Sequence, residues 1–404
     1  MTPAPNPKSQ IPNPKSAIRN PQSAIQRLIP FHQTSIVTIM KSLLRILVLL
    51  TAILISHAAA LEMNHGIVFH KEGRFAGWPA NGGIWNWGNE ILIMHSELTY
   101  HYYPNQHSYD RSKPAHTVLS RSLDAGNTWE TIRTEAFTKK DPKVLEEPMA
   151  FSNPDFGLRS RDNLFWYTDD RGHHWKGPFL FPDFGIENPL TSRTDYLIDD
   201  ENTLLVFLSA KAPSVQAGLQ DRAFSARTND GGLSWEFQGW MTAYPYGVRS
   251  VMPSTVRLQD HELLSVVRRR IDAHDNEELG RLDVNWVEAE YSEDNGHNWT
   301  KQSMVAFTDI SHHNGNPGAL AKLSDGTLVV VYGFRGHPFG IRAKTSTDGG
   351  KTWGHEIILR DDGLVYDLGY PKAVTLPDGR VFVCYYIATP ERPNQHIAYT
   401  ILNP

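Results

Sequence analysis

Short apolar runs separated by tight turns recur along residues 61–404, and no helical period accompanies them. Residues 319–332 and 373–385 are two examples, each with an Asp-Gly pair between its apolar halves. An Asp-Gly pair in this setting is the strongest short signal for a β-hairpin. Weaker copies centre on Asp200 and Asp260. The pattern predicts an all-β chain, and counting the inner hairpins gives six sheets.

A second repeat, S/T-x-D-x-G-x-x-W, occurs five times between these hairpins. Its copies begin at Ser122, Thr168, Thr228, Ser292 and Ser346, which spaces the aspartates 46, 60, 64 and 54 residues apart. This spacing fits a four-stranded antiparallel blade with its connections. We therefore predict a six-bladed β-propeller of four-stranded antiparallel blades. Strands near residues 66–70 and 396–402, from both ends of the chain, are expected to close the last blade.

The chemistry of the five-fold repeat is that of a turn. Its Asp carboxylate can accept hydrogen bonds from nearby backbone N–H groups, and its Gly permits positive φ. Its Trp, at the start of the next strand, can pack over the turn. We interpret all five carboxylates as structural and none as catalytic.

The first sixty residues have a different character from the rest. Residues 1–39 form a low-complexity tract with repeated Asn-Pro pairs and no hydrophobic period, so we do not expect them to belong to the mature fold. Residues 40–60 combine Lys41 and Arg45 with a short apolar stretch and small residues, the pattern of a secretory signal peptide. The apolar stretch is too short for a stable membrane anchor. We expect a secreted or periplasmic protein whose propeller spans residues 61–404.

Composition narrows the possible partners. The formal net charge is −5, so no basic excess favours nucleic acid. Cys384 is the single cysteine, which excludes an intrachain disulfide and a cysteine-based zinc site. The eighteen histidines show no metal-ligand spacing, and we predict neither a metal nor a cofactor. Many aromatic residues favour a protein that binds carbohydrate.

The five turns on six blades resemble the Asp boxes of the sialidase (neuraminidase) superfamily, in its bacterial Asp-box, or BNR-repeat, branch. The resemblance covers nearly all of residues 61–404. It implies a carbohydrate-active propeller, although Asp boxes are specific for the fold and not for one activity. Sialidases hold a sugar carboxylate with three arginines, and they use an aspartate as acid/base and a tyrosine nucleophile activated by a glutamate.

Carried over residue by residue, the resemblance implies the following site. Arg74, Arg268 and Arg335 would bind the carboxylate, with Arg342 as the rival of Arg335. Asp110, fourteen residues before the first Asp-box aspartate, would be the acid/base. Tyr370, before the last Leu-Pro-Asp-Gly turn, would be the nucleophile. Arg193 and Asp195 could line the same pocket, with His312 and His313 as further candidates.

The chain departs from the family pattern in two places. Tyr386 stands where a glutamate often supports the first arginine. The activating glutamate is also missing, since residues 246–255 contain no carboxylate. Without a base, a phenol keeps a pKa near 10 and is a poor nucleophile. Asp367 or a nearby histidine could substitute for the glutamate.

Three functions remain open at this point. The first is an exo-acting glycoside hydrolase of the sialidase type, which releases a terminal acidic, sialic-acid-like sugar. The second is another carbohydrate enzyme on the same scaffold, such as a lyase or a hydrolase of uronic or deoxy sugars. The third is a non-catalytic carbohydrate-binding propeller, which the missing glutamate favours.

Overall fold

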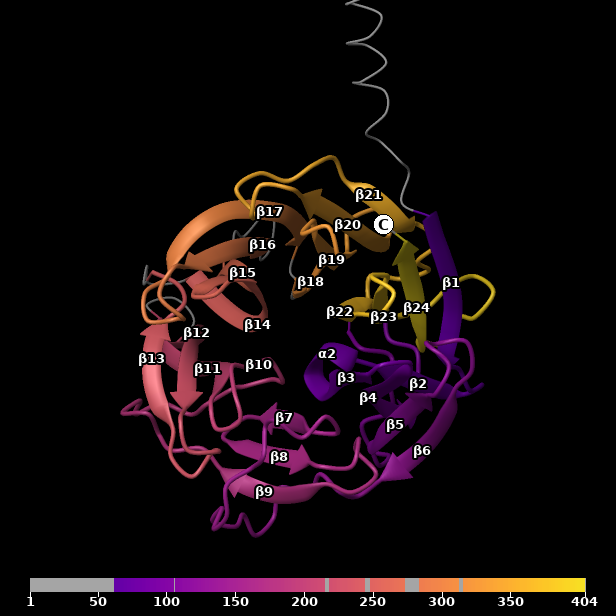
Figure 1. Cartoon of the computed structure of the whole chain (residues 1–404). Helices are drawn as coiled ribbons and strands as arrows, with labels where there is room; N and C mark the ends of the chain where they lie inside the picture. The colour runs from indigo at the N-terminus through magenta and orange to yellow at the C-terminus, as the bar shows by residue number, and fades with distance from the viewer. Residues whose placement is uncertain are drawn as a thin grey trace, which may run out of the picture. The chain divides into compact units, whose positions relative to one another are not determined.

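Six antiparallel sheets follow one another around a ring, which makes the fold a six-bladed β-propeller (Figure 1). The computed structural model describes residues 62–104, 106–214, 218–243, 248–272, 283–311 and 315–403. The predicted fold class is therefore confirmed. The low-complexity tract and signal peptide expected over residues 1–60 lie outside the described residues. Across the described part of the chain, no helix combines the length and apolar character needed to cross a bilayer.

Blades 1 to 3 cover the first half of the ring. Their elements are β2 (Arg74–Gly77), α2 (Pro79–Gly82), β3 (Gly83–Trp87), β4 (Glu90–Thr99), β5 (His116–Ser122) and β6 (Glu130–Thr134) in blade 1; β7 (Gly157–Arg161), β8 (Leu164–Thr168) and β9 (Lys176–Leu180) in blade 2; and β10 (Tyr196–Ile198), β11 (Leu204–Ser214), β12 (Gly218–Thr228) and β13 (Glu236–Trp240) in blade 3. Blade 1 has five strands, because the short helix α2 splits its inner strand into β2 and β3, which both pair with β4. Blade 2 has three strands among the described residues.

Blades 4 to 6 have four strands each. Their elements are β14 (Val248–Gln259), β15 (Glu262–Asp272), β16 (Asp283–Ser292) and β17 (Thr300–Ser311) in blade 4; β18 (Gly318–Lys322), β19 (Leu328–Phe334), β20 (Gly340–Ser346) and β21 (Ile357–Arg360) in blade 5; and β22 (Gly369–Thr375), β23 (Val381–Ile387), β24 (His396–Asn403) and β1 (Glu62–Phe69) in blade 6. Strand β1 pairs with β24 from Glu62↔Asn403 onward, so both ends of the described chain close this blade, as predicted.

The Asp boxes connect the last two strands of blades 1 to 5. In the first, Asp124 Oδ1 accepts hydrogen bonds from the Thr128 backbone N–H at 2.8 Å and from the Ser122 hydroxyl at 2.8 Å, and Asp124 Oδ2 accepts one from the Thr128 hydroxyl at 2.6 Å. Gly126 has φ 95°. The other four boxes repeat this pattern of bonds, which confirms that these carboxylates build turns.

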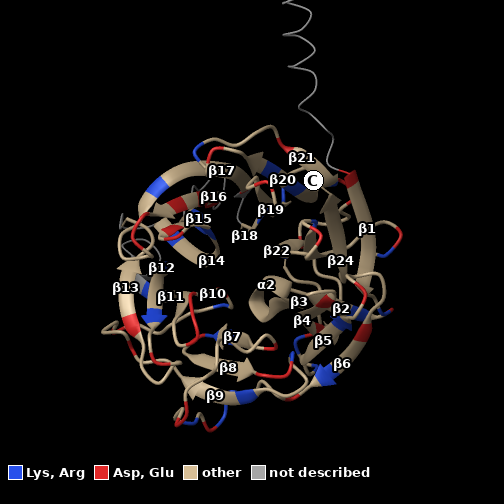
Figure 2. Cartoon of the chain, viewed as in Figure 1, with Lys and Arg blue, Asp and Glu red and all other residues tan. Residues whose placement is uncertain are grey.

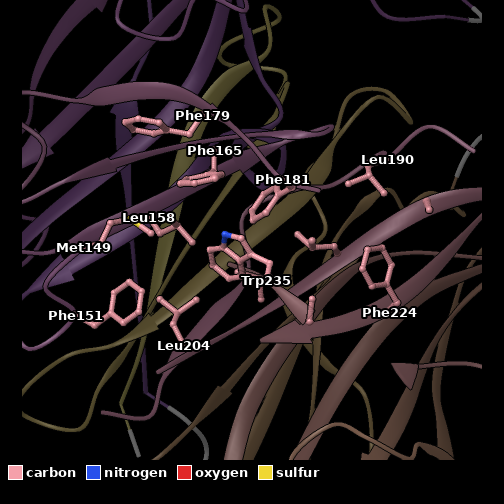
Figure 3. Close-up of a cluster of buried hydrophobic side chains, with 14 of the residues drawn as sticks. Met149, Phe151, Leu158, Phe165, Phe179, Phe181, Leu190, Leu204, Phe224 and Trp235 are labelled. Carbon is pink, nitrogen blue, oxygen red and sulfur yellow. The ribbon is translucent and has the colours of Figure 1, made fainter. Parts of the chain in front are cut away.

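Each Asp-box tryptophan contacts the preceding blade as well as its own turn. Trp129 of blade 1 packs against Phe382 of blade 6, with ring centroids 5.6 Å apart. Trp235 of blade 3 packs against Phe165 of β8 and Phe181, which directly follows β9, in blade 2 (Figure 3). The ring centroids lie 5.8 and 5.1 Å from that of Trp235. These rings belong to a buried cluster that joins the two blades. The Asp boxes therefore fix neighbouring blades to each other.

Antiparallel pairing decides which residues meet at the opposite face of the ring. The Asp boxes lie where the next-to-last strand of each of these blades ends. Inner strands begin, and second strands end, at the other face, which we call the site face. Gly369 at the start of β22 thus pairs with Tyr386 near the end of β23, and Val251 of β14 pairs with Arg268 of β15.

Candidate active site

Tyr370 lies at the start of the inner strand of blade 6, on the site face. The register of β22 and β23 shifts between Gly369 and Lys372, so Tyr370 sits in a bulge with φ 47°. Its backbone N–H donates to Asn316 Oδ1 at 2.8 Å. Two other bulky residues on inner strands or beside them, Trp78 and Met252, also have positive φ, at 60° and 59°. Such conformations are strained for large side chains and cluster at functional sites.

Two arginines from different blades converge on the Tyr370 ring. Arg268 Nη1 of blade 4 donates to the Tyr370 hydroxyl at 3.0 Å. Arg335, directly after β19 of blade 5, lies with its guanidinium carbon 5.8 Å from the ring centroid, the same distance as that of Arg268. Both arginines are buried, with exposed fractions of 4% and 5%. The structure thus brings together three of the residues singled out in the sequence.

The two guanidinium groups change the acidity of the phenol. Burial alone raises the pKa of Tyr370, because it disfavours the charged phenolate. The positive charges of Arg268 and Arg335, and the hydrogen bond from Arg268, outweigh burial and leave the pKa below its ordinary value. Within the described ranges, Arg268 is the one hydrogen-bond partner of the Tyr370 hydroxyl, and no carboxylate reaches it. The lowered pKa of this phenol therefore comes from neighbouring cations.

Asp367 anchors a second network beside the phenol. Its Oδ1 accepts hydrogen bonds from the Tyr386 hydroxyl at 2.5 Å and from His107 Nδ1 at 2.7 Å, and its Oδ2 accepts one from Gln395 at 3.3 Å. Arg335 Nη2 donates to the Tyr386 hydroxyl at 3.2 Å. Asp367 does not reach Tyr370. It acts instead on Tyr386, whose pKa burial and the Asp367 charge raise well above the ordinary value.

A cavity of about 450 Å³ opens beside Tyr370 and extends over blades 1 and 2. Its walls include Tyr370, Trp78 and His107, and on the far side Lys139, Arg159 and Arg161. The Trp78 and His107 rings meet edge to face, with centroids 4.9 Å apart. Because a carboxylate only accepts hydrogen bonds, the contact with Asp367 places a proton on His107 Nδ1 and leaves Nε2 for another partner. A concave wall that combines aromatic rings with three basic side chains is suited to a small anionic ligand.

The remaining predicted arginines lie at different distances from this centre. The Arg193 guanidinium interacts electrostatically with Tyr370 and Arg268, and its Nε donates to Asn81 of the cavity wall at 2.9 Å. Arg74 turns toward the outer strands of its own blade, where its Nε donates to Glu97 at 2.9 Å and its Nη1 to Thr99 at 2.8 Å. The structure shows no contact between Arg74 and Tyr370 among the described residues.

The two predicted carboxylates occupy other surroundings. Asp110 caps a local turn, where its Oδ1 accepts hydrogen bonds from the Ser112 hydroxyl at 2.7 Å and backbone N–H at 2.9 Å. These bonds lower its pKa, and Asp110 does not line the described cavity. Asp195 lines a separate cavity of about 350 Å³ and accepts a hydrogen bond from Thr255 at 2.8 Å. Burial raises its pKa to about 7, against the opposing charge of Lys372.

Arg342 and the stretch that lacks the activating glutamate both lie in well-defined surroundings. Arg342 donates to the backbone carbonyls of Pro338 and Arg360 and lies 3.4 Å from Glu356, so it braces blade 5. In the stretch without a carboxylate, Arg249 forms an ion pair with Asp221 of blade 3 and contributes to the lowered pKa of Tyr370. His312 and His313 lie outside the described residues.

His107 is a site residue that the sequence alone does not indicate, although it lies in the same loop as Asp110. His107 stands three residues before Asp110, and its partner Asp367 lies 260 residues away. Asp367 and a nearby histidine are the residues that the sequence offers in place of the missing glutamate. No spacing rule in one sequence joins them, because their contact depends on blade 6 closing next to blade 1.

Five Asp boxes on six antiparallel sheets define the class of the fold, a six-bladed β-propeller with Asp-box turns. A model of the BNR repeat-like domain matches residues 159–383, more than half of the chain. The chain therefore belongs to the BNR repeat-like family, and the resemblance to the sialidase superfamily is confirmed. A search of curated proteins finds no match.

Several solved structures share the fold at low sequence identity. A protein of unknown function from Dyadobacter fermentans is 21% identical, with a TM-score of 0.63, over 85% of this chain and 99% of that chain. The NanB sialidase from Streptococcus pneumoniae is 12% identical, with a TM-score of 0.53, over 84% and 70%. An α-L-arabinanase from Penicillium chrysogenum, complexed with arabinobiose, is 16% identical, with a TM-score of 0.54, over 85% and 98%. At these identities the likeness concerns the fold.

Proposed function

We propose that the protein is an exo-acting glycoside hydrolase that releases a terminal acidic, sialic-acid-like sugar. The observation that carries this proposal is the convergence of Arg268 and Arg335 on Tyr370, beside a cavity. Guanidinium groups suit the planar, two-oxygen geometry of a carboxylate. Both arginines are buried beside the same phenol, so together they can hold an anionic group of a sugar. The signal-like pattern of residues 40–60 supports an activity outside the cytoplasm.

Tyr370 serves as the nucleophile in this proposal. The sugar's carboxylate, held by Arg268 and Arg335, presents its anomeric carbon to the Tyr370 oxygen. The arginines favour the phenolate, which supplies by charge what the missing glutamate would supply by proton removal. The phenol oxygen forms the bond to the anomeric carbon as the glycosidic bond breaks. Water then releases the sugar, and the two displacements predict net retention of configuration.

His107 serves as the acid/base residue. It lines the cavity, and Asp367 holds its ring in one orientation, which is the arrangement that general acid–base catalysis needs. The imidazolium gives its Nε2 proton to the departing oxygen, and the neutral ring later takes a proton from water. Asp110, the residue expected from the family resemblance, remains the alternative. Its lowered pKa and its hydrogen bonds to Ser112 favour a turn-capping role.

A carbohydrate-binding propeller without turnover is the second candidate. It is favoured by the absence, among the described residues, of a carboxylate at the Tyr370 hydroxyl. Such a protein would bind the same acidic sugar through Arg268 and Arg335. Both candidates predict binding of the acidic sugar, but only the glycoside hydrolase predicts that a product forms.

Activity on aryl glycosides of acidic sugars separates the candidates. We expect the wild-type protein to release the free sugar and the aryl group, and Tyr370→Phe to lose this activity by at least about a hundredfold. Tyr385→Phe is a matched control, because Tyr385 is buried in the same blade and bonds Thr400. Sugar binding without product would select the non-catalytic candidate. Unchanged activity in Tyr370→Phe would remove Tyr370 from the mechanism.

A further inference from the structure

The cavity wall opposite Tyr370 contains a deeply buried cation, Arg159 of β7. Its guanidinium carbon lies 4.5 Å from the ring centroids of both Phe137 and Trp166, which contact each other edge to face. Arg159 has an exposed fraction of 7% and lines the cavity. Its Nε donates to the Met94 sulfur at 3.1 Å, a weak acceptor. The aromatic rings and the thioether hold the guanidinium in place without neutralising it.

Arg159 forms no ion pair in the described part of the chain, although the charge of Asp162 acts on it. Its Nη1 is buried and makes no hydrogen bond with the described residues. Burial, together with the charges of Arg161 and Arg193, lowers its pKa to about 9, so the group remains charged at neutral pH. A buried, unpaired guanidinium opposes folding, because it loses hydration and gains no ion pair. Such a group at a cavity wall indicates that a ligand supplies the missing anion.

Neighbouring cations add to the positive charge around Arg159. Arg161 Nε lies 3.6 Å from Asp162 Oδ2, and Lys139 also pairs with that oxygen. Arg193 Nη1 lies 3.4 Å from Asp162 Oδ1. One carboxylate thus serves three cations. Around the ring as a whole, acidic and basic positions are mixed on the blades (Figure 2), so this excess belongs to the cavity and not to a basic face.

We infer that Arg159, with Arg161 and Lys139, forms a second anion subsite, which binds a carboxylate or sulfate on the sugar next to the terminal residue. This inference rests on the proposed function, because the same cavity holds Tyr370 at its other side. Its volume of about 450 Å³ lies within the range of small-ligand pockets. The preferred substrate is then a glycan with two anionic groups on adjacent sugars.

Calorimetry with two matched thioglycosides, which resist hydrolysis, tests the subsite. Both carry the terminal acidic sugar, and one also carries a sulfate on the neighbouring sugar. We expect the wild-type protein to bind the sulfated ligand about tenfold more tightly, because the sulfate gains charge-assisted hydrogen bonds from this subsite. Arg159→Met, which keeps the side-chain volume, should remove this preference and leave the affinity for the unsulfated ligand within about twofold.

Controls separate the subsite from the proposed function and from folding. Arg380→Met removes a charge from an exposed turn of blade 6 and should keep the preference, whereas Arg268→Met should weaken both ligands. Arg159→Met should melt no lower than wild type, because it removes an unpaired buried charge; if it does not fold, Arg161→Gln replaces it.

If neither sugar binds, the proposed function fails. Inorganic sulfate then decides: a rise in melting temperature that depends on Arg159 supports the subsite. No such rise, or an equal loss for both sugars in Arg159→Met, overturns it.

Discussion

The Asp boxes and the candidate site use the same kinds of side chain in opposite ways. In each Asp box, the carboxylate finds its donors within four residues, as Asp124 does with Thr128. At the site, partners are distant in sequence: Tyr370 bonds Arg268 across 102 residues, and Asp367 bonds His107 across 260. Because each Asp-box carboxylate finds its hydrogen-bond donors nearby in the sequence, the same turn can recur in five blades. Long-range assembly produces one centre where charges meet without a local partner.

The largest expected effect separates the two acid/base candidates at the site. His107→Gln should reduce turnover of an aryl glycoside by about 10²–10⁴-fold, because it removes the group that protonates the leaving oxygen. Asp110→Asn should change the rate by less than about threefold, because the amide oxygen still accepts from Ser112. Steady-state kinetics with a substrate of poor leaving group measures both. The reverse result would assign the acid role to Asp110.

A smaller effect, on stability, is expected when an Asp-box tryptophan is truncated. Trp235→Ala removes a buried ring from the cluster of blades 2 and 3 and should lower the free energy of unfolding by about 3–5 kcal/mol. Activity per folded molecule should stay unchanged, because the site lies on the other face. Urea unfolding with active-site titration measures the two quantities. Leu233→Ala, in the same turn but 47% exposed, should change stability by less than about 0.5 kcal/mol.

The smallest expected effect is the pH dependence that the Asp-box carboxylates confer. Hydrogen bonds from Thr128 and Thr352 lower the pKa of Asp124 and Asp348 to about 2. Their contribution to stability is therefore complete above about pH 4, near the unfolded pKa, and disappears as the pH falls through 2. Thr352→Val removes one donor, so the acid loss of stability should begin at higher pH, with a cost of about 1 kcal/mol or less. Identical urea midpoints from pH 2 to 6 in both proteins would contradict this assignment.

These contrasts explain how much could be predicted from the sequence. The Asp boxes were predicted residue by residue, since every donor and acceptor lies inside an eight-residue repeat. Arg268, Arg335 and Tyr370 were found through their family positions and converge in the structure. Arg74 could not be placed from the sequence, because Glu97 on the next strand offers it a partner. Arg159 gave no signal, because its surroundings come from separate loops and strands.

The pairing of β1 with β24 has a consequence for how the chain reaches its final state. Strand β24 must find β1, which lies more than three hundred residues earlier in the chain. Until it does, blade 6 exposes strand edges that invite pairing with other chains. A chain interrupted before residue 396 would keep its Asp boxes and yet lack the β1–β24 pairing that closes blade 6, whose Tyr370 meets Arg268.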